Sequence, residues 1–206
     1  MKKMDKFKVK VTNKKQIITF LVVLFIVGLI AGSLFTIILN ENDANMVKES
    51  INSFINNIKN NKLNYNSALI NSCTSNILSI LLIWLLGISI IGIPIIVFLY
   101  FSKSFMLGFS ISSIISIYKT KGFFIALGYV FPAHIISILV YTLLLIYALR
   151  MSLYLLKAIL FRKTIDFKII IKRYLLILLI CIIGSVIASL LEVYLMPNLI
   201  KIIINF

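Results

Sequence analysis

Five long runs without a charged side chain occupy most of this 206-residue chain. The hydrocarbon core of a bilayer needs about 20 consecutive apolar residues per helix, and most of the runs reach that length. The chain is 61% hydrophobic and only 13% charged, whereas a soluble domain is roughly a quarter charged. The sequence therefore predicts an all-α, polytopic helical membrane protein rather than a barrel of alternating strands. The runs cover residues 17–39, 74–102, 104–118, 122–149 and 174–191.

The number of crossings depends on the run at 104–118, which spans only about 22 Å as a helix, less than the roughly 30 Å hydrocarbon core. It is either a short third span or re-entrant. Lys and Arg accumulate in cytoplasmic loops. If the run crosses, 15 of the 21 basic residues lie inside and 6 outside; otherwise the count is 11 against 10. We therefore predict five spans, the other four at about 17–39, 76–101, 123–149 and 170–194.

The predicted layout places the N-terminus in the cytoplasm. The run at 17–39 exceeds the usual 7–15-residue core of a signal peptide, so it is predicted to be an uncleaved anchor. The net charge of +15 is attributed to topology and to nearby anionic lipid headgroups, not to nucleic-acid binding. The segments are a basic N-terminus 1–16, a first transmembrane helix 17–39, an extracytoplasmic segment 40–75 and a transmembrane bundle 76–206.

The extracytoplasmic segment is predicted to contain an amphipathic helix. Asn40 is a suitable cap, and the acidic side chains after it favour a helix start. The helix either rests on the bilayer surface or on the spans, or it offers a partner-binding surface. Its apolar positions follow helical spacing: Val47, Ile51, Phe54, Ile55 and Ile58.

Small residues on the first span form the pattern Gly28-x-x-x-Gly32. Two glycines one turn apart let a second helix approach closely. The pattern predicts contact with another helix of this chain or of a second protein. It leaves open whether the protein forms a homo-oligomer.

Side chains suited to catalysis are scarce, since the sequence has six acidic residues and one histidine. It contains neither an H-E-x-x-H zinc motif nor a Walker loop. Ser110 and His134 could form a nucleophile and its base, but Ser110 is better interpreted as a helix-packing residue. The sequence predicts no catalytic, cofactor-binding or metal-binding residue.

His134 and Glu192 are the ionisable residues predicted near membrane depth, where such groups are costly and face protein or water. If the fourth helix starts at Pro132, His134 lies near the outer surface, and a contact with Glu192 is feasible. If it starts at Phe123, His134 lies about 16 Å deep and Glu192 about 6 Å from its end. His134 is either a structural tether or part of a pathway or partner site.

Two glycine-marked segments resemble the stage II sporulation protein M family. They are Phe105-Met106-Leu107-Gly108-Phe109 and Gly122-Phe-Phe-Ile-Ala-Leu-Gly128-Tyr-Val-Phe-Pro132-Ala-His134. The resemblance implies a non-enzymatic scaffold in the cell membrane, at the sporulation septum and the engulfing membrane. It also implies that the protein recruits or anchors peptidoglycan-degrading partners, the sporulation proteins D and P. A permease subunit working with a separate ATPase is the alternative, suggested by the short run, Pro132 and His134.

Overall fold

The computed structural model describes residues 14–160 and 167–205, and within these ranges every regular element is a helix. Five of these helices are long and apolar enough to cross a membrane. The predicted class, a polytopic helical membrane protein, is therefore confirmed. The elements, with η denoting a π-helical turn, are α1 Lys14–Ile38, α2 Glu41–Lys59, α3 Tyr65–Gly87, α4 Gly92–Tyr129, η1 Val130–His134, α5 Ile135–Leu160, α6 Phe167–Leu190, η2 Leu191–Leu195 and α7 Met196–Asn205.

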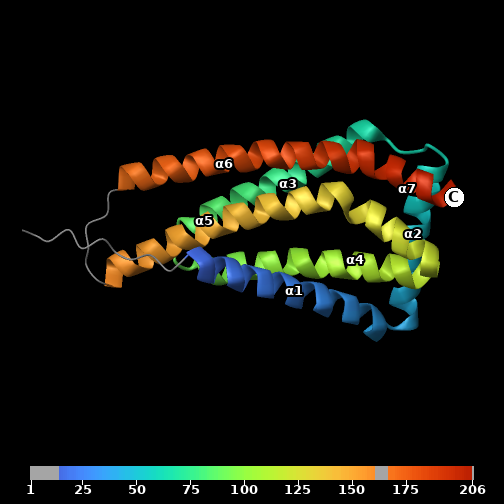
Figure 1. Ribbon diagram of the computed structural model, residues 1–206, viewed down its shortest axis with the longest axis horizontal. Coiled ribbons are helices and arrows are strands. Elements are labelled where there is room, and N and C mark those ends of the chain that lie inside the picture. The colour runs from blue at the N-terminus through green and yellow to red at the C-terminus, as the bar shows by residue number, and fades with distance from the viewer. Residues whose placement is uncertain (1–13, 161–166, 206) are drawn as a thin grey trace, which may run out of the picture.

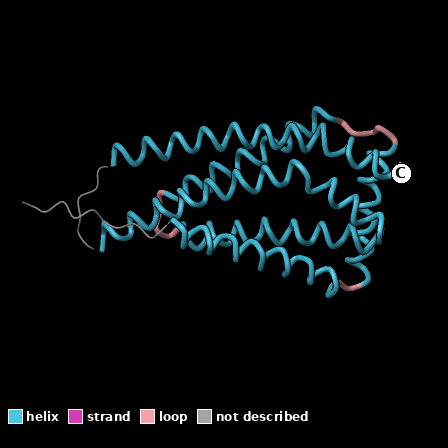
Figure 2. The backbone as a smooth tube through the Cα atoms, in the orientation of Figure 1, coloured by secondary structure: helices cyan, strands magenta, loops and turns pink. Residues whose placement is uncertain are grey.

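The long helices run side by side and form an elongated bundle with two different ends (Figure 1). One end carries α2 and α7 and is called the α2 end. The other carries the start of α1, the turn at 88–91, the end of α5 and the start of α6, and is called the basic end. The described connections between helices are short and lie at these ends (Figure 2).

The second and third spans differ from the prediction. The expected span at 76–101 is interrupted, because α3 ends at Gly87 and α4 begins at Gly92. A Cβ at Gly92 would overlap the carbonyl of Leu86, so this tight turn requires glycine. The turn was missed because the run at 74–102 is uncharged throughout, and charge cannot mark a boundary there. The third span starts at Gly92 and is of full length, so the expected short or re-entrant third span is wrong.

The chain reverses direction at Lys119, whose φ of 51° and ψ of −123° break the helix inside α4. Lys119 ends the third span, and residues 120–129 begin the fourth, which continues through η1 into α5. A Cβ at Gly122 would lie 2.5 Å from the carbonyl oxygen of Ile114, so glycine permits the close return of the chain. The fourth span is thus longer at both ends than the predicted 123–149.

The glycines of α1 pack against α4. A Cβ at Gly28 would lie 2.7 Å from Ser104 Cβ, and one at Gly32 would overlap the carbonyl of Phe105. Gly108 faces them from α4, where a Cβ would overlap the carbonyl of Leu29. Backbones this close allow hydrogen bonds between the helices: Ser33 Oγ donates to Gly108 O at 3.3 Å, and the hydroxyls of Thr36 and Ser112 lie 2.8 Å apart.

The amphipathic helix α2 lies across the α2 end with its apolar face toward the bundle. Asn40 caps it by accepting a hydrogen bond from Asp43 N at 2.8 Å. Ile55 and Ile58 are buried in a cluster with residues of α4 and α7, while Val47, Ile51 and Phe54 are half-buried. Within the segment 40–75 that was predicted to be extracytoplasmic, α3 already begins at Tyr65, capped by Asn64.

Candidate functional site: a polar cavity inside the bundle

Lys103 lies in the middle of the third span, about 17 Å along the helix from Gly92. The predicted second span at 76–101 and third at 104–118 leave Lys103 in an inner loop between them, which is wrong because the turn falls at 88–91 instead. Lys103 Nζ donates a hydrogen bond to Tyr141 Oη at 3.1 Å and lies 4.3 Å from the centroid of the Tyr141 ring. A cation at this depth is costly and needs such partners.

Tyr141 connects Lys103 to a buried polar network on α3. Tyr141 Oη donates to the carbonyl of Asn76 at 3.5 Å. Asn76 Nδ2 donates to Ser189 Oγ at 2.9 Å and to Ser72 Oγ at 3.4 Å. Ser72 Oγ in turn donates to a carboxylate oxygen of Glu192 at 2.6 Å. The network therefore runs from a cationic group on α4 to an anionic group on η2.

Both ionisable residues singled out from the sequence lie in π-helical turns. His134 ends η1 and Glu192 lies in η2, and these two turns contact each other. A π turn inserts an extra residue into a helix and is frequent at functional sites. Pro132 lies in η1, and its side chain is outside the described set. The His134 ring packs against Tyr129, with 4.4 Å between ring centroids.

A cavity of about 170 Å³, the mid-bundle cavity, brings these groups together. Lys103, His134 and Glu192 all line it, so the two residues considered as a contact from the sequence, His134 and Glu192, face the same cavity. Ser110 and Tyr129 also line it. Ser110 and His134, the pair considered for catalysis, therefore line the same cavity. Its donors and acceptors suit it to hold water, a proton or a small polar group at membrane depth.

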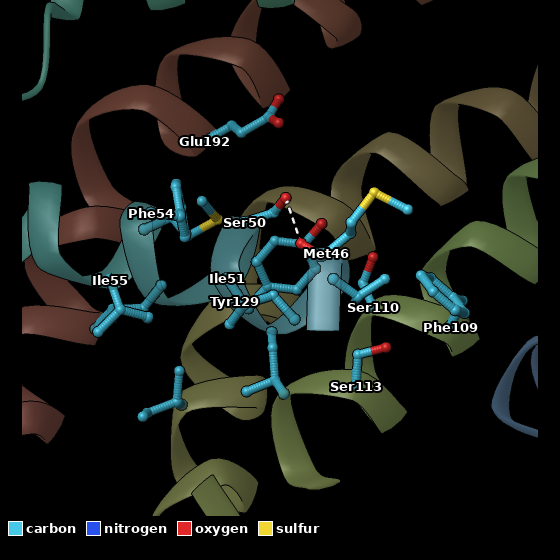
Figure 3. A pocket seen from close by; sticks show the side chains of 15 residues that line it. Met46, Ser50, Ile51, Phe54, Ile55, Phe109, Ser110, Ser113, Tyr129 and Glu192 are labelled. Atoms are coloured by element: carbon cyan, nitrogen blue, oxygen red, sulfur yellow. Dashed lines mark hydrogen bonds between the residues drawn. The ribbon is translucent and has the colours of Figure 1, made fainter. Parts of the chain in front are cut away.

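A second cavity of about 530 Å³, the α2-end cavity, lies between α2 and the bundle (Figure 3). It shares Ser110, Tyr129 and Glu192 with the mid-bundle cavity, and the rest of its lining is mostly apolar. Ser113 Oγ is buried on its wall without a hydrogen-bond partner among the described residues. Ser50, also on the wall, donates instead to the carbonyl of Met46 at 2.9 Å.

The residues highlighted by the sequence fall into three places. His134 and Glu192 line the mid-bundle cavity, and Gly28, Gly32 and Gly108 form the α1–α4 contact. Four of the five apolar positions of α2 line the α2-end cavity, namely Val47, Ile51, Phe54 and Ile55, while Ile58 packs in the cluster beside it.

Several residues of the polar site were missed by sequence reasoning: Ser72, Asn76, Lys103, Tyr141 and Ser189. Lys103 carried a usable signal, because it is a charged residue between two uncharged runs. Asn76 carried a weaker one, because Ser72, Thr74 and Ser75 precede it and only the residues after it are mostly apolar. Recognising Gly87 and Gly92 as a turn would have placed both residues at mid-span.

Five long apolar helices with ionisable side chains around an internal cavity define a multi-pass membrane protein with a polar intramembrane site. The sequence profile described as Stage II sporulation protein M matches residues 21–197. The chain therefore belongs to the stage II sporulation protein M family, and is a sporulation-related membrane protein. No significant match was found among curated proteins or solved structures.

Proposed function

We propose that the protein is a non-enzymatic membrane scaffold in endospore formation. It recruits or anchors peptidoglycan-degrading partners, the sporulation proteins D and P, during engulfment of the forespore. Family membership supports the setting. The observation that carries the scaffold role is the position of α2: its apolar face is fixed on the bundle, so its polar face is held outward as a platform.

The proposed orientation places the N-terminus in the cytoplasm and α2 outside the cell membrane. With Lys103 inside the span, twenty basic residues remain. By sequence position, fourteen flank the basic end and six flank the α2 end. The positive-inside rule then assigns the basic end to the cytoplasm. In a chain whose free Cys73 and Cys181 are replaced by serine, Lys121→Cys should be labelled by an impermeant thiol reagent on intact cells. Lys172→Cys should be labelled only after lysis; the reverse pattern contradicts the orientation.

The test of recruitment is co-purification from sporulating cell membranes. Removing α2 would also remove buried packing, so outward substitutions are sharper. Ser53 and Asn56 are exposed on α2, and Asn66 is exposed at the start of α3 on the same end. Ser53→Arg with Asn56→Arg should lose the hydrolases that accompany the unaltered protein, whereas Asn66→Arg should retain them. If no wall hydrolase accompanies the unaltered protein, the scaffold role is wrong.

One observation favours a second candidate, a permease subunit working with a separate ATPase. The mid-bundle cavity lies where the π-helical turns η1 and η2 of two spans contact each other, and π turns are frequent at functional sites. In reconstituted vesicles this function requires substrate-dependent flux or stimulated ATP hydrolysis with the ATPase present. Glu192→Gln should then reduce the flux, while a scaffold should keep its partners in that variant.

A further inference from the structure

A third cavity, of about 310 Å³, lies between α5 and α6 at the basic end. Two guanidinium groups line it, from Arg150 on α5 and Arg173 on α6. Three tyrosines, Tyr147, Tyr154 and Tyr174, complete the polar part of its wall. Every ionisable group among its described lining residues is therefore a guanidinium or a phenol, which gives the cavity a positive field.

Two hydrogen bonds fix the level of this cavity along the bundle. Tyr174 Oη donates to the carbonyl of Trp84 at 2.9 Å, and Ser152 Oγ donates to the carbonyl of Gly87 at 2.8 Å. The cavity thus lies level with the last turn of α3. Trp84 and Tyr174 are stacked, with centroids 5.5 Å apart and planes 17° apart. Trp and Tyr concentrate at the membrane–water interface, so this level corresponds to the lipid headgroups.

We propose that this cavity binds the phosphate of an anionic phospholipid headgroup. A guanidinium presents paired N–H donors that match phosphate oxygens, and basic pockets between transmembrane helices are known to receive anionic headgroups. The volume equals about ten waters at about 30 Å³ each, which is room for a phosphodiester and its glycerol. Met151 and Ile170 provide apolar wall for the lipid beneath the headgroup.

The positive-inside rule alone does not require the two arginines Arg150 and Arg173 to line one cavity. Lys172, beside Arg173, is exposed and satisfies the positive-inside rule without being among the residues that line this cavity. Arg150 is instead half-buried and faces a cavity shared with a second guanidinium. The proposal is independent of the scaffold role, because it concerns the opposite end of the bundle from α2.

The experiment uses the full-length protein in detergent with added lipid, read by native mass spectrometry and by the shift in melting temperature. Phosphatidylglycerol should bind at least tenfold more tightly than phosphatidylcholine. Arg150→Gln with Arg173→Gln should weaken phosphatidylglycerol binding at least tenfold. The matched control, Lys15→Gln with Lys172→Gln, removes two exposed charges from the same end and should weaken it less than threefold.

Equal losses in the two double variants would show diffuse surface attraction and overturn the proposal, as would undiminished binding in the arginine variant. Inorganic phosphate is the second arm. If it stabilises the protein as much as phosphatidylglycerol does, the lipid assignment is wrong. If the double variant does not fold, Arg173→Gln alone replaces it, because Arg173 is exposed; its binding should fall at least threefold, and an unchanged value overturns the proposal.

Discussion

Replacing Gly32 with alanine should separate α1 from α4. The added Cβ would lie 2.8 Å from the carbonyl carbon of Phe105 and 2.9 Å from the backbone nitrogen of Phe109, and it would overlap the Phe105 oxygen. All three atoms belong to the backbone of α4, so no side-chain rotation relieves the contact. Ordinary van der Waals contact begins at 3.4 Å. The helices must therefore move apart by at least about 0.6 Å, a gap that forfeits a quarter or more of the dispersion energy.

Two hydrogen bonds between these helices are already long. Ser33 Oγ donates to Gly108 O at 3.3 Å, and Ser112 Oγ donates to Ser33 O at 3.3 Å. A separation larger by about 0.6 Å breaks both hydrogen bonds. Such bonds contribute about 0.6 kcal/mol each in membranes, so their loss costs about 1.2 kcal/mol, with dispersion adding on the order of 1 kcal/mol. The total is about 2 kcal/mol, or roughly 4–8 °C in melting temperature for a chain of this size.

Gly128→Ala is the matched control, because the nearest contact of a Cβ there is the end of the Ile203 side chain at 3.0 Å, and the nearest backbone atom, Ile200 N, lies at an ordinary contact distance of 3.8 Å. Both variants gain the same helix propensity, about 1 kcal/mol, so that gain cancels in the comparison. Thermal unfolding in detergent, followed by size-exclusion chromatography after heating, should show Gly32→Ala melting well below Gly128→Ala. Equal melting temperatures for the two variants would refute the close α1–α4 packing.

Three further predictions concern the polar network and the α2 end. Tyr141→Phe should destabilise the protein by about 1.5–3 kcal/mol, because it removes the acceptor of a charged donor. Lys103→Met should be neutral or stabilising, since an apolar replacement leaves no buried charge. In thermal melts, Tyr141→Phe should therefore melt at a lower temperature than Lys103→Met. Asn76→Leu should cost about 1–2 kcal/mol through two lost intramembrane hydrogen bonds, and an unchanged melt would contradict the network. Tyr194→Ala removes a ring stacked on Tyr65 at 5.6 Å, worth about 1 kcal/mol, and should speed amide hydrogen exchange at the start of α3 and not at its middle.

Hydropathy predicted the class and the number of long helices because lipid imposes its requirement on every span separately. It failed over 74–102, where the turn at 88–91 consists of uncharged residues and so leaves the uncharged run unbroken. There the boundary depends on local geometry, namely the close approach of Gly92 to Leu86. Lys103 then appeared to end a span, although it lies at the middle of one.

The polar site was only half predictable for the same reason. His134 and Glu192 stood out because charge is rare within apolar runs. Ser72 and Ser189 did not, because serines are common in helix packing and only the fold shows that Asn76 joins them. The π turns that carry His134 and Glu192 have no sequence signal of the kind that marks a helix cap.

The pairing of α1 with α4 also means that α1 is synthesised well before its partner helix. The partner of Ser33 lies 75 residues further along the chain. At about 5–20 residues per second, synthesis takes roughly 4–15 s to cover that distance. During this interval the first helix resides in the bilayer with its glycine face uncovered and open to helices of other proteins. Pairing of α1 with the third span of its own chain therefore competes with binding of α1 to helices of other membrane proteins.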